Sequence, residues 1–237
     1  MTLCNENAPI LVNEEMGCNI WLMTVRAPEI AATARPGQFV HVKVPGMEAH
    51  ILRRPFGVYA ADAEAGTVDM MYQVLGFGTE HMTELAIVDT VEMIGPIGRG
   101  WQPPEGCKRA LIVAGGVGSA PVYPQVKWLK ERGIDVDVVE GAKTKDMLIL
   151  EEEMRSVAGN LYITTDDGSY VRKGMVTDVV KDLVENQGKK YDVCVAIGPM
   201  IMMKFVCRLT KELGIPTIVS MNPIMVDGTG MCGACRV

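Results

Sequence analysis

The apolar positions along the chain follow two successive patterns, and the first covers residues 1 to about 103. There, short runs rich in Val, Ile, Tyr and Met alternate with turn signals such as Pro36-Gly37 and Gly95-Pro96. One short helix is expected at about 79–86. Closely spaced strands with little helix between them predict a small antiparallel β-barrel. The expected strands are 19–26, 38–44, 67–75 and 90–94.

The second pattern begins after a predicted linker, Pro103-Pro104-Glu105-Gly106, and alternates apolar β-runs with helical periods. This alternation predicts an α/β domain with a parallel sheet, and such sheets bind ligands at the carboxyl ends of their strands. The remaining tail, 222–237, is glycine-rich and aperiodic. The expected strands are 109–114, 135–140, 161–165, 191–197 and 216–221, and the expected helices are 119–132, 147–157, 175–186 and 200–213.

Charge and hydropathy exclude several classes of protein. The 237 residues carry a formal net charge of −6, which argues against a nucleic acid or an anionic membrane as partner. No apolar run reaches the roughly 18–20 residues of a membrane helix. The N-terminus also lacks the basic and apolar regions of a signal peptide. We therefore expect a cytoplasmic protein.

The seven cysteines divide into two kinds. An odd number scattered through a chain of this length is a poor disulfide framework, and lone cysteines in apolar stretches are expected to pack in the core. Cys232 and Cys235 are different, because they form a C-x-x-C pair in the glycine-rich tail.

A first candidate site lies at Arg53-Arg54-Pro55. A guanidinium beside a rigid proline suits bidentate binding of a phosphate. Further along, Gly78-Thr79 opens the expected helix, whose free N–H groups favour a second phosphate oxygen. Phe56 follows the proline and could lie against a flat ring system. The alternative is a surface arginine pair and a hairpin without a ligand.

A second candidate site follows the expected strand 109–114. Gly115-Gly116-Val117-Gly118 is a glycine turn before a helix, and its missing side chains would let a pyrophosphate approach the backbone. Without a ligand, the same glycines would form only a tight strand-to-helix turn. Three later strand ends carry small or polar residues where a nucleotide would lie, namely Glu140-Gly141-Ala142-Lys143, Thr165-Asp166-Asp167-Gly168 and Ile197-Gly198-Pro199-Met200.

The tail contains a third candidate site, formed by Asp227, Cys232 and Cys235. Two thiolates in a C-x-x-C pair have metal-ligand spacing, and backbone amides near glycines can point at the inorganic sulfur of an iron–sulfur cluster. Zinc, a redox dithiol and two unligated cysteines are the alternatives. The glycines of this loop are Gly228, Gly230 and Gly233.

Taken together, these motifs resemble the ferredoxin–NADP reductase superfamily over essentially the whole chain. The resemblance implies an FAD-binding β-barrel at 1–103, an NAD(P)-binding α/β domain at 104–221 and a [2Fe–2S] loop at 222–237. Two branches of the family resemble this chain in particular. One is the small subunit of NADH-dependent reduced ferredoxin:NADP oxidoreductase, also called sulfide dehydrogenase beta subunit. The other is the electron-transfer subunit of NAD-linked dihydroorotate dehydrogenase.

The resemblance also assigns cofactor positions. It implies that Arg54 holds the FAD pyrophosphate and that Phe56 borders the isoalloxazine ring, whereas Gly57 departs from the usual Ser or Thr. The FAD-binding positions are Arg54, Pro55, Phe56, Gly57, Met71, Tyr72, Gln73, Gly78 and Thr79. Those expected for NAD(P)H are Gly115, Gly116, Val117, Gly118, Asp166, Gly198, Pro199 and Met200.

The tail favours one of the two branches. The dihydroorotate type places a cysteine where this chain has Asp227, whereas MVDGTGMCGACRV resembles the sulfide dehydrogenase type, in which an aspartate takes the first ligand place. The segment RRPFG, in contrast, resembles the dihydroorotate type. In both types a further cysteine ligand follows, so we expect the sequence to be truncated within this motif.

The resemblance implies an electron-transfer flavoprotein subunit. It would move electrons between NAD(P)H, FAD and a [2Fe–2S] cluster and pass them to a larger catalytic subunit in a heteromer. A dihydroorotate dehydrogenase subunit in pyrimidine biosynthesis, a flavin reductase without a cluster, and a nucleotide-binding regulatory module with a zinc or redox C-x-x-C are the alternatives. Hydride transfer between two cofactors needs no side-chain acid or base, so no catalytic residue is expected.

Overall fold

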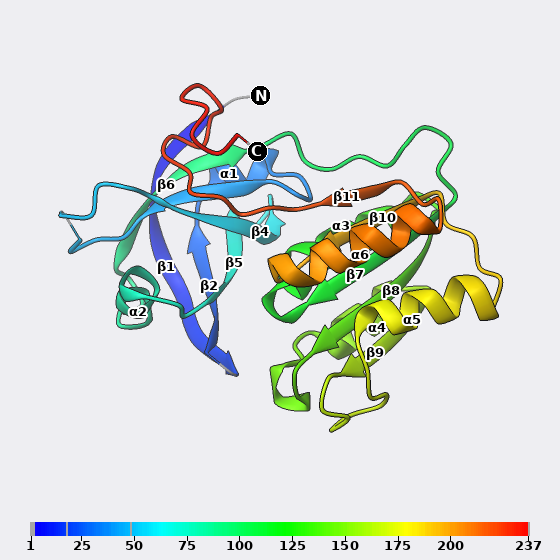
Figure 1. Cartoon of the computed structure of the whole chain (residues 1–237). Coiled ribbons are helices and arrows are strands. Elements are labelled where there is room, and N and C mark those ends of the chain that lie inside the picture. The colour runs from blue at the N-terminus through cyan, green and yellow to red at the C-terminus, as the bar shows by residue number, and fades with distance from the viewer. Residues whose placement is uncertain (1–2, 18, 48, 237) are drawn as a thin grey trace. The chain divides into compact units, whose positions relative to one another are not determined.

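The computed structural model describes residues 3–17, 19–47 and 49–236. The chain forms two compact units. One comprises Met1–Trp101 together with Asn222–Val237, and the other comprises Gln102–Met221 (Figure 1). In the described ranges, every helix is too short or too polar to cross a bilayer.

The first unit is built around a closed barrel, with the strand order β1-β2-β5-β4-β3-β6. Every neighbouring pair for which a register is defined is antiparallel, which confirms the predicted antiparallel barrel. The strands are β1 (Cys4–Gly17), β2 (Ile20–Arg26), β3 (Phe39–Lys43), β4 (Arg54–Asp62), β5 (Thr67–Gln73) and β6 (Thr90–Ile97), and the helices are α1 (Pro28–Thr33) and α2 (Phe77–Thr83).

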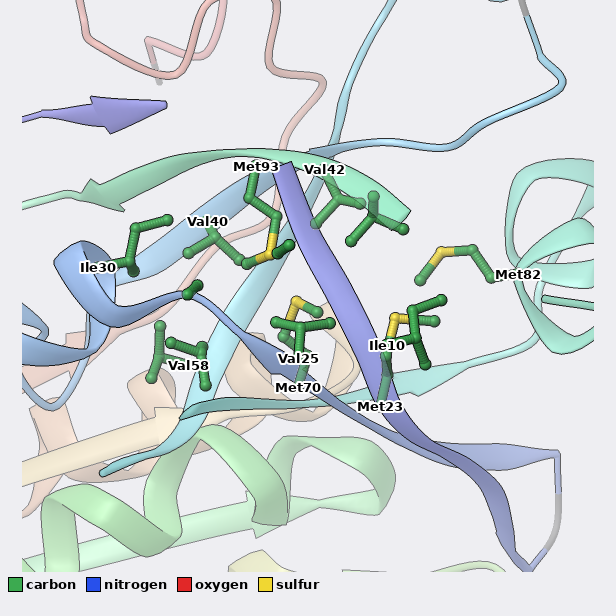
Figure 2. Close-up of a cluster of buried hydrophobic side chains, with 14 of the residues drawn as sticks. Ile10, Met23, Val25, Ile30, Val40, Val42, Val58, Met70, Met82 and Met93 are labelled. Atoms are coloured by element: carbon green, nitrogen blue, oxygen red, sulfur yellow. The ribbon is translucent and has the colours of Figure 1, made fainter. Parts of the chain in front are cut away.

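Apolar side chains from all around the barrel meet in its interior (Figure 2). Met23 of β2 stands opposite Met70 of β5, and both are fully buried. Met82 reaches the same core from α2. Burying each such side chain contributes about 1.5–3 kcal/mol, so this core determines where the surrounding loops sit.

Two of the barrel strands, β1 and β4, were not predicted from the sequence. In β1 only Cys4, Ala8 and Ile10 are buried, and polar residues with Pro9 occupy most of the other positions. In β4 a single residue, Val58, is buried. Burial alternates in β1 only from Cys4 to Ile10, where Glu6 interrupts the apolar positions, and β4 shows no alternation, so neither segment gives a sustained strand pattern.

The second unit contains a five-stranded parallel sheet, as predicted. The strand order is β11-β10-β7-β8-β9. Its strands are β7 (Arg109–Gly115), β8 (Asp135–Ala142), β9 (Asn160–Thr165), β10 (Val193–Ile197) and β11 (Thr217–Val219). Its helices are α3 (Ser119–Glu131), α4 (Glu151–Val157), α5 (Val176–Lys181, continued by a π-helical turn over Asp182–Asn186) and α6 (Met200–Glu212).

Helices cover both faces of this sheet. Gly141 of β8 lies against Val176 of α5, and the preceding residue, Glu140, lies near Ser119 of α3. Because successive strand residues point to opposite faces, α3 and α5 pack on opposite sides. The other two helices, α4 and α6, contact α3 and α5 respectively.

A polar cluster around the buried carboxylate of Asp137 lies at the amino end of the sheet. The carboxylate of Asp137 accepts hydrogen bonds from Asn160 Nδ2 (2.6 Å), Lys189 Nζ (2.8 Å) and the Tyr191 hydroxyl (2.7 Å). Burial opposes ionisation of this carboxyl, but the hydrogen bonds outweigh burial and lower its pKa. The cluster ties β8, β9 and the start of β10 together at the end remote from the glycine turn.

Candidate functional site

The two adjacent arginines of the barrel have different roles. Arg53 forms an ion pair with Glu92 of β6 and also donates from Nη1 to the Glu92 carbonyl oxygen (3.1 Å). The hydrogen bond from Arg53 is the main reason that the pKa of Glu92 is lowered. Arg53 therefore already has a charged partner within the barrel unit.

Arg54, in contrast, faces the start of α2. Its Nη1 donates to the carbonyl oxygen of Leu52, and in the described part of the chain no acidic side chain pairs with its guanidinium. A Cβ added to Gly78 would lie 2.9 Å from Arg54 Nε. Only a glycine therefore lets the guanidinium lie this close to α2. An unpaired arginine over a helix start is chemistry that suits a phosphate group.

The other predicted flavin positions lie in the same unit as Arg54 and Gly78. Thr79 shapes the turn before α2, because its hydroxyl accepts the N–H groups of Leu75 (2.9 Å) and Gly76 (3.2 Å). The rings of Phe56 and Tyr72 lie 5.8 Å apart by their centroids. Met71 and Tyr72 are buried in β5, and Pro55, Gly57 and Gln73 are half-buried.

An open hollow of about 560 Å³ lies beside the arginine segment within the first unit. Residues 49–55 form one side of it, and the beginning of the tail, 222–225, forms the other. No pattern in the sequence predicts that these two segments lie together, because more than 160 positions separate them. The hollow shows that the tail begins next to Arg54.

In the second unit, the glycine turn and the Gly198 segment come together. β7 and β10 are parallel neighbours, with Ala114 opposite Ile197. A Cβ on Gly115 would lie 2.6 Å from the sulfur of Met202, and one on Gly198 would lie 3.0 Å from the backbone nitrogen of Gly115. The glycines are thus required by packing as well as suited to a ligand.

This junction lies where the order of the sheet reverses. From β7 the chain continues to β8 on one side, whereas β10 lies on the other, and ligands of open α/β sheets bind at such a point. Gly116 has a positive φ of 56°, and Pro199 and Met200 are exposed. Asp166 is exposed as well, but it follows β9 at the edge of the sheet, with β8 between it and β7.

Glu140 is a feature whose significance the sequence did not reveal. Glu140 is only 1% exposed. Among the residues that the structure describes, neither of its carboxylate oxygens has a hydrogen-bond partner, although the Ser119 side chain lies nearby. Burial raises the pKa of this carboxyl to about 7. An acidic residue ending an apolar strand was visible in the sequence, but its burial depends on α3 and α4.

Asp227 organises the tail loop. Its carboxylate accepts backbone N–H groups from Thr229 (2.7 Å), Gly230 (3.3 Å) and Cys232 (2.8 Å). Those hydrogen bonds, the one from Cys232 first, lower the pKa of Asp227. The Ala234 N–H points at Cys232 Sγ (3.5 Å), a contact that also supports sulfur ligands of metals.

The loop packs on the barrel through a buried histidine. His41 of β3 is fully buried, and its pKa is lowered by burial. Within the described part of the chain, neither of its ring nitrogens has a hydrogen-bond partner. A Cβ on Gly228 would lie 2.9–3.1 Å from three atoms of the His41 ring. Gly228, with a φ of +72°, therefore lets the loop backbone lie directly on the imidazole.

The donor atoms of the tail fit a sulfur-ligated metal only in part. Cys232 is exposed and Cys235 is half-buried, and both carry free thiols of the required type. Asp227, however, is turned toward backbone amides. In residues 3–17, 19–47 and 49–236, no three His, Cys, Asp or Glu side chains are gathered as a metal site. The metal role of Asp227, Cys232 and Cys235 stays a prediction.

The fold and the two glycine-bordered sites define a two-domain oxidoreductase class. Residues 8–101 match the oxidoreductase FAD-binding domain family, and residues 112–208 match the oxidoreductase NAD-binding domain family. The chain belongs to the ferredoxin–NADP reductase-like oxidoreductases that join these two domains, which confirms the resemblance seen in its sequence.

Individual relatives support this assignment. The chain is 51% identical to an uncharacterised Clostridium beijerinckii protein encoded in the adh 3′ region, covering 96% of this chain and 78% of that protein. It is 42% identical to a Thermotoga maritima homologue of the dihydroorotate dehydrogenase B (NAD⁺) electron-transfer subunit, covering 90% and 73%.

Among solved structures, a chain of the NADH-dependent reduced ferredoxin–NADP oxidoreductase, studied for flavin-based electron bifurcation, is similar with a TM-score of 0.87. It is 38% identical, and the match covers 98% of this chain and 82% of that one. The cytochrome b5 reductase domain of Ulva prolifera nitrate reductase shares the fold at 19% identity, with a TM-score of 0.71 and coverage of 92% and 97%.

Proposed function

We propose that the protein is an electron-transfer subunit that takes electrons from NADH onto FAD and passes them to a larger redox partner. The observation that carries the proposal is the guanidinium of Arg54 beside Gly78, with which no acidic side chain of the described residues forms an ion pair. In the barrel of an FAD-binding family, this arrangement supplies a fixed cation for the pyrophosphate. Phe56, packed on the barrel core, would offer a flat surface to the flavin ring.

The second unit would hold the nicotinamide nucleotide. The turn Gly115-Gly116-Val117-Gly118 leads into α3, a 13-residue helix. The pyrophosphate of the nucleotide would therefore contact a backbone without side chains and the positive end of the helix. Gly198, Pro199 and Met200 border the same junction. Bound FAD supplies the chemistry, because a flavin can accept a hydride and release electrons singly. NADH is favoured over NADPH by the resemblance.

We further propose that the tail carries a [2Fe–2S] cluster. Cys232 and Cys235 would supply thiolates, and Asp227 would become a third donor by exchanging its amide hydrogen bonds for a metal. The positive φ angles of Gly228, Gly230 and Gly233 and the N–H contact to Cys232 Sγ support this assignment. The exposed Cys232 and the half-buried Cys235 lie in the same unit as the proposed flavin site, an arrangement that suits transfer to a partner.

An anaerobic visible spectrum of the purified protein tests the proposal. We expect a flavin band near ~450 nm that bleaches when one equivalent of NADH is added. Arg54→Met should purify with much less flavin, whereas Arg53→Lys should keep it, because Arg53 bonds only to the barrel. Iron and acid-labile sulfide analysis tests the cluster separately. A colourless protein that does not respond to NADH would exclude this function.

A second candidate is the electron-transfer subunit of a dihydroorotate dehydrogenase. Several relatives at 31–42% identity carry that name, and this observation favours it. Asp227 at the first ligand place favours the ferredoxin-linked type instead. The two are distinguished by the subunit that co-purifies with the tagged chain. NADH-dependent reduction of orotate by the isolated complex would support the dihydroorotate type, and its absence together with ferredoxin-linked activity would exclude it.

A further inference from the structure

The side chain of Asn13 joins three elements of the barrel unit. From β1, its Nδ2 donates to the carbonyl oxygens of Met82 (2.8 Å) and Leu85 (3.0 Å), at and just beyond the end of α2. Its Oδ1 accepts the hydroxyl of Tyr72 in β5 (3.0 Å). Tyr72 is 2% exposed, and its hydroxyl is engaged by this hydrogen bond to Asn13.

The position of α2 depends on contacts such as these. A helix of seven residues is not stable alone, and the last carbonyl groups of any helix lack partners within it. Asn13 satisfies carbonyls at this end, while Met82 anchors the helix in the barrel core (Figure 2). His81 adds a contact from its Nε2 to the carbonyl oxygen of Pro45 (3.0 Å).

The other end of α2 meets Arg54. Gly78 is buried, and the guanidinium of Arg54 lies so close that a Cβ on Gly78 would be 2.9 Å from its Nε. A helix of two turns moves as one piece, so a shift at its carboxyl end also displaces Gly78. Displacement would alter the surface on which the guanidinium rests.

We propose that Asn13 is a positioning residue for FAD, acting through α2 and Gly78 to hold Arg54 where the pyrophosphate binds. Tyr72 assists by fixing the orientation of the Asn13 amide. The inference rests on the proposed function, because it takes Arg54 as a pyrophosphate ligand. It assigns a role in cofactor binding to a side chain that touches no cofactor.

The test is the rate at which FAD leaves the full-length holoprotein, followed by the rise in flavin fluorescence after dilution. We expect Asn13→Ala to speed release by about 10-fold and Arg54→Met by about 100-fold. Because Asn13 acts through Arg54, the double variant should release FAD within about twofold of Arg54→Met alone. Tyr72→Phe, which leaves both amide donors in place, should give a smaller increase and serves if Asn13→Ala does not fold.

A matched control separates positioning from general stability. Tyr162→Phe removes a hydroxyl that accepts a hydrogen bond from Lys189 (2.7 Å) in the second unit, so it should lower thermal stability without changing FAD release. Two results would overturn this inference and leave the proposed function standing. One is that the effects of Asn13→Ala and Arg54→Met multiply in the double variant. The other is that Asn13→Ala and Tyr72→Phe both release FAD at the normal rate while Arg54→Met releases it faster. Normal release from Arg54→Met would overturn the placement of FAD as well.

Discussion

Replacing Glu140 by glutamine tests how a buried, unpartnered carboxyl affects the stability of the nucleotide unit. In the folded chain its pKa is raised from 4.5 to about 7 by burial, and Glu151, Glu153 and Arg155 of α4 are the charged groups near it. Because the pKa is raised, the folded state keeps the proton while the unfolded chain loses it. The stability contributed by the neutral carboxyl is therefore complete below pH 4.5 and is lost as the pH rises to about 7.

The size of the effect follows from the same two values. At about 1.36 kcal/mol per pKa unit, the interval from 4.5 to about 7 corresponds to ~3 kcal/mol. Between pH 5 and pH 8 the free energy of unfolding should fall by ~2.5 kcal/mol through this group. Glu140→Gln has no proton to lose, so its stability should lack this decline, whatever constant difference the amide introduces.

The assay is urea unfolding from pH 5 to pH 8. The fluorescence of Trp128 on α3 reports on this unit in a background whose other two tryptophans are replaced by phenylalanine. Glu131→Gln, which removes the same charge from an exposed position on α3, is the control and should follow the parent protein. If the stabilities of Glu140→Gln and its parent run parallel across this range, the reasoning about the buried carboxyl is wrong.

Three further substitutions test other parts of the structure. Gly118→Ala would place a methyl group against a backbone carbonyl of β10. It should therefore weaken NADH binding by at least about 10-fold in a fluorescence titration. An unchanged affinity would contradict the packing seen at the turn. Asp137→Asn leaves Lys189 without its buried partner, and thermal or urea unfolding should show a loss of about 3 kcal/mol, whereas no loss would mean that the cluster is dispensable. Asp227→Ala removes the acceptor of three backbone amides of the tail. The thiol of Cys232 in metal-free protein should then react with a thiol reagent at a different rate. An unchanged rate would show that the carboxylate does not organise the loop.

The sequence predicted the two architectures because their core patterns are local. The helical period of 175–186 identifies the buried face of a helix, and the continuous apolar run of β7 identifies a whole buried strand. Neither pattern depends on the rest of the chain. β1 and β4 were missed because only three and one of their residues, respectively, are buried, and their pairing is fixed by neighbours distant in sequence.

The candidate site was predictable where backbone geometry needs glycine, and less so where partners decide the role. Gly78 and Gly115 signal close approach by the absence of a side chain. Arg53 and Arg54, however, are the same residue type side by side, and only the presence of Glu92 in β6 distinguishes them. Asn13 carries no local signal, since its partners lie 59 to 72 positions away.

The chain enters the barrel unit twice, once at its beginning and again at Asn222. The nucleotide unit is thus an insertion held at both of its ends, so cutting one connection would not release it. It also means that the C-x-x-C loop, resting on His41, is carried by the same body as Arg54. Because Arg54, Cys232 and Cys235 all belong to one unit, the spacing among them is set inside that unit and does not depend on where the nucleotide unit lies.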